Sequence, residues 1–177
     1  ILSGLVGSEM CIRDSQYATL SLNNTSTTDI ANRLPAAGQL TLRGSVFTIS
    51  GRPDSASSQR LATLSLAEGQ NFISLTNGGS GMRSVVLSVG SLVVDPDATL
   101  LLSSGITGQS GNNVRMVADN APALLVNNII PWAANGGDLV SYVAPGTSST
   151  IPNFAGGFAI LGTAGYASYD SGTLAGL

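Results

Sequence analysis

The segment VVDPDAT places two carboxylates, Asp95 and Asp97, two residues apart between two apolar runs. A pair of carboxylates on one face is what the hydrolysis of a glycosidic bond requires, so this pair is the first candidate for chemistry. Asp-Pro-Asp between apolar runs is also a turn sequence, because Asp bonds to nearby backbone groups and Pro fixes φ. We therefore interpret Asp95 and Asp97 as turn residues and expect no catalytic residue in this chain.

The other residue types leave few reactions open. The chain has no His and no Lys, and Cys11 is its only cysteine. A Ser or Cys nucleophile would lack a His base, zinc would lack Cys and His ligands, and a Schiff base would lack Lys. GGD (136–138) could offer oxygen atoms to calcium, but neither the glycine-aspartate nonapeptide nor an EF-hand loop is present. We expect no metal site, no cofactor site and no enzymatic activity.

Two kinds of side chain could contact a polysaccharide. Trp132, beside Pro131, could form a platform for sugar stacking, although we favour a role as a filler at a corner of the fold. Six of the seven arginines are distributed along residues 16–177, at Arg33, Arg43, Arg52, Arg60, Arg83 and Arg115. Their dispersal favours solubilising charge that also protects sheet edges over a grip on an acidic polymer. Asn23 and Asn24 lie in glycosylation sequons of NNTS, which we interpret as a turn or a polar ladder.

The composition indicates one β-rich domain with a neutral surface. The chain has 177 residues, of which 43% are hydrophobic, only 5% aromatic and only 10% charged. Low charge with abundant Ser, Thr and Asn suits a repetitive β-structure with polar outer faces. The net charge of −3 argues against nucleic-acid binding, which needs a basic surface. No apolar run approaches the roughly 20 residues of a membrane span.

The N-terminal stretch LVGSEMCIRDS (5–15) differs in composition from everything after it. It is no secretory signal, because its apolar run is too short and charges of both signs follow. The stretch resembles the in-frame translation of a transposase-type DNA sequencing adapter. We therefore assign residues 1–15 to an adapter-derived, non-native segment. Residues 16–177 are then one β-solenoid segment truncated at both ends, with no signal peptide of its own.

Alternation of apolar and polar residues dominates from Gln16 onward, which predicts short strands closed by Gly, Asn and Asp-Pro turns. The residues expected on the apolar face are Ala18, Leu20, Leu22, Leu40, Leu42, Phe47, Ile49, Ala62, Leu64, Leu66, Ile73, Leu75, Val85, Leu87, Val89, Leu92, Val94, Ala98, Leu100 and Leu102. Breaks are expected at Gly44-Ser45 and around Glu68-Gly69. No stretch has convincing helical periodicity, so we expect almost no helix.

The strand blocks recur, and this recurrence predicts the fold class. The LTL, TLSL and VLSV cores begin near residues 40, 63 and 86, a spacing of roughly 23 residues that is typical of stacked repeats. We predict an all-β, parallel β-solenoid (β-helix), in which each turn of the coil, or rung, carries two or three short strands. The alternative is a β-sandwich or jelly roll, but those folds carry more outer charge and more aromatic core residues.

The last third differs from the rest. Residues 121–146 and 154–177 hold the only Trp and three of the four Tyr, and Pro residues interrupt their strands. We interpret this part as further rungs with looser turns, or as a lateral elaboration of the stack. No linker separates it, so we expect no second domain.

The chain resembles the bacterial autotransporter-associated β-strand repeat passenger proteins. The similarity lies in an ordered series of motifs: ATLSLNNTSTTDIANRL (18–34), GQLTLRGSVFTISG (38–51), SSQRLATLSLAEGQNFISL (57–75), SVVLSVGSLVVDPDATLLL (84–102), NNIIPWAANGGDLVSYV (127–143) and GYASYDSG (165–172). Leu139-Val140 departs from it, standing where the family prefers an aromatic-Ala pair.

The resemblance implies a right-handed β-solenoid passenger, exported to the cell surface or beyond. It implies a non-enzymatic structural segment of a large repeat protein, with adhesion or extracellular matrix building as its role and neighbouring rungs of the parent protein as its partners. It transfers no active-site residue. The alternative function is part of a polysaccharide-active or polysaccharide-binding β-helix protein, in which Asp and Arg side chains would converge in one groove.

Overall fold

The computed structural model describes residues 12–25, 32–77, 84–103, 106, 114–144 and 156–160, and its regular elements there are almost all strands. The strands are β1 (Ile12–Gln16), β2 (Thr19–Asn23), β3 (Gln39–Arg43), β4 (Val46–Ser50), β5 (Ser57–Thr76), β6 (Val85–Val94), β7 (Ala98–Leu102), β8 (Val114–Ala118), β9 (Ala133–Asn135), β10 (Asp138–Val143) and β11 (Gly157–Ile160). The one helix of the described part is a short 3-10 turn, η1 (Ala121–Leu124). The predictions of an all-β fold and of almost no helix are therefore confirmed.

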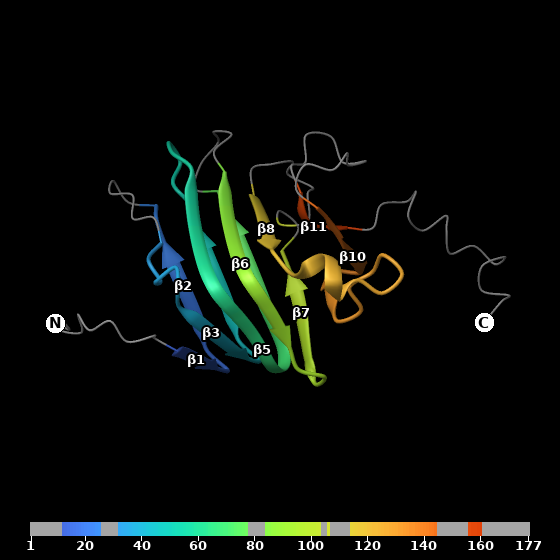
Figure 1. The fold of residues 1–177 in the computed structure, drawn as a ribbon. Coiled ribbons are helices and arrows are strands. Elements are labelled where there is room, and N and C mark those ends of the chain that lie inside the picture. The colour runs from blue at the N-terminus through green and yellow to red at the C-terminus, as the bar shows by residue number, and fades with distance from the viewer. Residues whose placement is uncertain are drawn as a thin grey trace, which may run out of the picture.

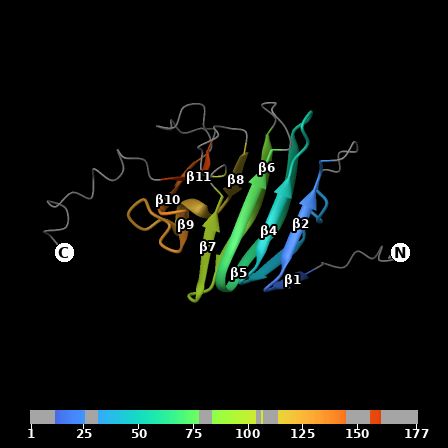
Figure 2. The same cartoon turned by 180° about the vertical axis from the view of Figure 1, so that it is seen from behind.

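The strands pair in two parallel series that share β5. In the first series β1, β3, the first half of β5, β6 and β8 lie side by side. In the second series β2, β4, the second half of β5, β7 and β9 do the same. Figures 1 and 2 show the result from both sides: the strands follow one another in chain order from β1 and β2 to β10 and β11.

The last strands break the parallel pattern. β9 and β10 form an antiparallel hairpin whose turn is Gly136-Gly137, where Gly136 has φ of +62°. β10 then pairs antiparallel with β11. The sheet is therefore mixed and does not close on itself. In the last third of the chain, β8 and β9 therefore continue the parallel pairing, whereas β10 and β11 depart from it.

The core is a set of aliphatic columns that run across the paired strands. Leu40 pairs with Leu64 and Leu64 with Leu92, and all three side chains are buried. A second column of the same kind joins Phe47, Ile73 and Leu102. Burial of such columns removes apolar surface from water in every strand layer, which is the main stabilising contribution to the fold. The alternation in the sequence predicted most of these inward-facing residues.

Three details of the predicted pattern are wrong. Ala18, which we expected on the apolar face, is exposed, because it lies just before β2 begins. Leu61 is buried whereas Ala62 is half-exposed. Ala62 and Thr63 both face outward, and this shifts the alternation of β5 by one residue. The uniform repeat of about 23 residues is also wrong, because Leu40, Leu64 and Leu92 are separated by 24 and then 28 residues. The repeat varies because both the strands and the turns between paired positions differ in length from one layer to the next.

The buried side-chain amide of Asn71 and the hydroxyl of Ser45 connect neighbouring layers where the chain passes from the first parallel series to the second. The backbone N–H of Ser45 donates to Oδ1 of Asn71, 3.1 Å away, and Nδ2 of Asn71 donates to the carbonyl of Thr99. The hydroxyl of Ser45 in turn accepts from the N–H of Ala18. These bonds give partners to the N–H groups of Ala18 and Ser45, which lie outside the strands at this point of the chain.

The adapter-like segment overlaps the first strand. Residues 12–15 lie in β1, whose backbone pairs in parallel with β3 from Ile12↔Gln39 to Gln16↔Arg43. Backbone pairing at a sheet edge is independent of sequence, so it is compatible with a segment of foreign origin. Residues 1–11, including Cys11, lie outside the described residues. Within the described part, no helix has the length and apolarity needed to cross a membrane.

Candidate functional site

Asp95 and Asp97 lie in the turn between β6 and β7, and both side chains are exposed. The N–H of Ala98 donates to the carbonyl of Asp95 at 3.0 Å, and the N–H of Gly69 donates to the carbonyl of Asp97. The backbone of these residues therefore closes the turn and connects it to β5. No described arginine forms an ion pair with either carboxylate.

The arginines are distributed among separate contacts. Arg43 faces Glu68, Arg52 binds Asp54 at 2.8 Å, and Arg60 reaches Asp119 at 3.4 Å. Arg33 donates through Nε to Oδ1 of Asn24, which is buried. Arg115 faces outward on β8, and Arg83 lies outside the described residues. The described arginines therefore do not line one common groove with the two carboxylates of the β6–β7 turn.

The remaining polar candidates have local roles. Oδ1 of Asn23 accepts from the N–H and the hydroxyl of Thr25, which is a turn motif. Asp138 is exposed beside the Gly136-Gly137 turn. Across the described ranges, no three His, Cys, Asp or Glu side chains are grouped closely enough to hold a metal ion.

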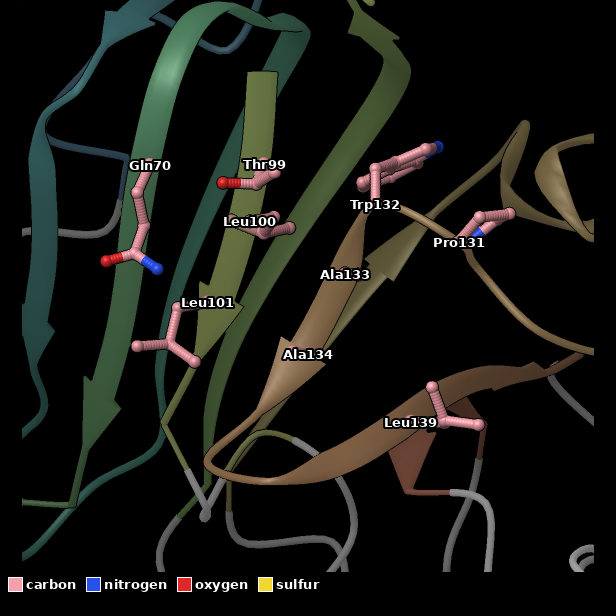
Figure 3. Close-up of a pocket in the computed structure, with 9 residues that line it drawn as sticks. All are labelled: Gln70, Thr99, Leu100, Leu101, Pro131, Trp132, Ala133, Ala134 and Leu139. Atoms are coloured by element: carbon pink, nitrogen blue, oxygen red, sulfur yellow. The ribbon is translucent and has the colours of Figure 1, made fainter. Parts of the chain in front are cut away.

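A groove lies on the outer face of β5, β7 and β9, and we call it the Trp132 groove. It has a volume of about 280 Å³. Its lining residues are Gln70, Thr99, Leu100, Leu101, Pro131, Trp132, Ala133, Ala134 and Leu139. Figure 3 shows these side chains around the β9 strand, with Leu139 on the neighbouring β10.

Strand register explains why the groove is there. Leu101 pairs with Ala134, and Ala134 pairs with Leu139, so the small Ala134 side chain lies between two leucines on one outward row. Gln70 pairs with Thr99 on the next outward row, and the carbonyl of Trp132 accepts from the N–H of Leu100 at 2.8 Å. The rows are separated by two residues along each strand, or about 7 Å. The methyl group of Ala134 therefore leaves a hollow between larger neighbours.

Trp132 both packs against the core and borders the groove. It is half-buried and packs against the hydrophobic core, as a corner filler would. It also lines the groove, so part of its ring faces solvent. Of the groove residues, only Trp132 and its neighbour Pro131 stand out in the sequence as candidates for ligand contact. Gln70, Thr99, Leu101, Ala134 and Leu139 carry no such signal, because each is an ordinary outward position until the register across the strands is known. Leu100 and Ala133 are buried core residues that also border the groove.

A second feature lies where β10 meets β8. Tyr142 is buried and makes an edge-to-face contact with Phe158, with ring centroids 5.4 Å apart. Burial raises the pKa of the Tyr142 hydroxyl, and Asp119 adds to the rise, while a hydrogen bond with the backbone of Ala118 and the charge of Arg115 oppose it. The Tyr142 side chain therefore connects β10 to β8 through its hydrogen bond with Ala118, and to β11 through the ring of Phe158.

Comparison with known proteins places the chain in no group. No protein-family model matches it, and neither a curated protein nor a solved structure gives a significant match.

Proposed function

We propose that this chain is a structural segment of a large, secreted or surface-exposed repeat protein with a right-handed parallel β-solenoid fold. The observation that carries the proposal is the succession of parallel strand pairs in which one residue of each layer faces its counterpart in the next. Leu40, Leu64 and Leu92 form such a column. A β-sandwich is built from antiparallel strand pairs, so the parallel pairs favour a solenoid over a sandwich. Crossover connections between parallel strands are right-handed in nearly all proteins, which is the basis for the proposed handedness.

The surface supports a structural role. The ion pairs of the described part are separate from one another, and the carboxylates of the β6–β7 turn belong to none of them. A stack of layers with a neutral polar exterior is rigid and extends in one direction as layers are added. The role of this segment is then to present a long surface outside the cell, for adhesion or matrix building. Its nearest partners are neighbouring rungs of the same parent protein.

A disulfide test examines the parallel stacking directly. Thr41 on β3 and Ser65 on β5 are paired and face outward. In a Cys11→Ser background, Thr41→Cys with Ser65→Cys places two cysteines on adjacent strands, with Cα atoms about 4.8 Å apart, within the Cα range of a disulfide. We expect oxidation to give a cross-linked monomer, detected by faster migration on a non-reducing gel.

The matched control is Thr41→Cys with Val93→Cys. Val93 pairs with Ser65, so it lies two strands away from Thr41, at about twice the strand spacing. This pair should not cross-link. Efficient cross-linking of the control, or none in the adjacent pair, would overturn the solenoid register.

The structural role is tested by adhesion and by hydrolysis assays. Beads coated with the protein should be retained on a polysaccharide film more strongly than albumin-coated beads, and incubation with the same polysaccharides should release no reducing ends. The enzymatic alternative, a polysaccharide-active β-helix, predicts release that Asp95→Asn or Asp97→Asn abolishes. That outcome would replace the structural role by an enzymatic one.

A further inference from the structure

We propose that the Trp132 groove binds a neutral, extended oligosaccharide. The inference does not depend on the structural role above, because it rests on the side chains of one outer face. Its first basis is shape: the ring of Trp132 borders a hollow with apolar walls, and Ala134 leaves the space between Leu101 and Leu139 open. The C–H face of a pyranose ring packs on such a combination of aromatic and aliphatic groups.

The second basis is the pair of polar side chains at one border of the groove. Gln70 and Thr99 are exposed, lie beside each other on β5 and β7, and form no side-chain hydrogen bond with any described residue. An amide and a hydroxyl offer both donors and acceptors, which sugar hydroxyl groups need. Their position on strands fixes them at one side of the apolar surface. The groove therefore has an apolar face and a polar border, as a sugar ring does.

The third basis is charge. All nine lining residues are uncharged, so the groove offers neither a cation for a uronic acid or sulfate group nor an anion for a basic ligand. A charged polymer would lose hydration on entering the groove and gain no ion pair in return. The chemistry therefore favours neutral sugars over the acidic polysaccharide that an arginine cluster would bind.

The strand pairing disfavours a peptide as the occupant. β7 is paired on both sides, by β5 and β9, and β9 is paired by β7 and β10. The backbone groups of these strands are used within the sheet, so a peptide strand has no edge to join at this site. A volume of about 280 Å³ fits one or two sugar rings and is small for an amphipathic helix.

The test uses the fluorescence of Trp132, the only tryptophan in the chain. Titration of the full chain with cellohexaose, xylohexaose and mannohexaose should give a saturable change in emission with at least one of them, half-complete on the order of 0.1–1 mM. Hexagalacturonate, an acidic hexasaccharide, should bind at least about tenfold more weakly. Tighter binding of the acidic sugar, or no response to any of the neutral ones, would overturn the proposal.

Two variants keep the reporter and separate binding from folding. Ala134→Leu fills the hollow on an outward position and should abolish the response, while Gln70→Ala should weaken binding about three- to tenfold through loss of hydrogen bonds. Thr48→Val, which changes an outward position on β4, is the control for surface substitutions and should bind as the unmodified chain does.

Two outcomes would contradict the proposal. Equal affinity of Ala134→Leu and the unmodified chain for the sugar, with far-ultraviolet circular dichroism unchanged, would place the sugar elsewhere. A change in emission on raising the protein concentration without sugar would assign the groove to a second copy of the chain instead.

Discussion

The N–H of Ser45 donates to the side-chain oxygen of Asn71, across 26 residues of sequence and one layer of the sheet. Asn71 is completely buried, and its Nδ2 also lies within hydrogen-bond distance of the carbonyls of Glu68, Gly69 and Thr99. One amide therefore connects three successive layers at the bend where the two parallel series meet. A buried polar group with every partner in place specifies a single arrangement, because each partner would be costly to leave unpaired.

Replacing Asn71 by Ala should lower the free energy of unfolding by about 1–3 kcal/mol, because the buried N–H of Ser45 would lose its partner. Gln70→Ala is the matched control, since it removes an amide from the adjacent position, which faces solvent. It should change stability by less than about 0.5 kcal/mol. Urea unfolding followed by circular dichroism measures both. Equal losses in the two variants would contradict the role of the buried amide.

Gly90 marks a close approach between β6 and β5. A Cβ atom there would lie 2.8 Å from the carbonyl oxygen of Ala62, a backbone atom held by its own ladder. We expect Gly90→Ala to destabilise the fold by about 1–3 kcal/mol, because the two strands must move apart. In Gly137→Ala the new Cβ meets nothing within 4 Å, so the midpoint of unfolding should stay nearly unchanged. A stabilising Gly90→Ala would show that β6 can shift freely along β5.

Asp119 and Asn120 are neighbours with unequal roles. The ion pair of Asp119 with Arg60 has side-chain exposures of 61% and 50%, so Asp119→Ala should cost less than about 1 kcal/mol. The amide of Asn120 accepts from the N–H of Leu92 and donates to its carbonyl, both at 2.9 Å. Asn120→Ala should cost about 1–3 kcal/mol, because it leaves both backbone groups unpaired. Thermal unfolding in low and high NaCl measures both costs, and only that of Asp119→Ala should shrink with salt. A larger loss for Asp119→Ala in both buffers would refute this assignment.

Tyr142 should make stability fall at alkaline pH. Burial holds the pKa of its hydroxyl above 10.0, the ordinary value that applies in the unfolded chain. Its contribution to stability is therefore complete below pH 10 and is lost as the pH rises through the pKa of the folded state, because the unfolded chain releases the proton first. Unfolding by urea at a series of pH values from 8 to 11 should show this decline.

Tyr142→Phe is the control for that decline. It keeps a ring to pack edge-to-face on Phe158 and removes the ionisable group. The variant should lose less stability than the unmodified chain between pH 10 and pH 11. An identical decline in both proteins would assign the pH dependence to other groups.

The alternation of apolar and polar residues by itself determined the all-β class and most of the core. Leu40, Leu42, Phe47 and Ile49 are buried as predicted, because a strand exposes alternate side chains to opposite faces wherever it lies. The turn at Asp95 and Asp97 was also predictable, because Asp and Pro act on nearby backbone. Local rules of this kind need no knowledge of which strand lies beside which.

Only the tertiary structure decided the pairings. The change of side-chain direction that buries Leu61 and exposes Ala62 depends on the pairing of β5 with β6, where Leu61 faces Val89, and the bond of Ser45 to Asn71 spans 26 residues. The antiparallel pairs of β10 and β11 join residues 14 to 20 positions apart. The Trp132 groove has the same origin, because Ala134 becomes the floor of a hollow only when Leu101 and Leu139 lie on either side of it. Alternation fixes which way a side chain points, whereas its neighbours depend on turn lengths and register, which vary from one layer to the next.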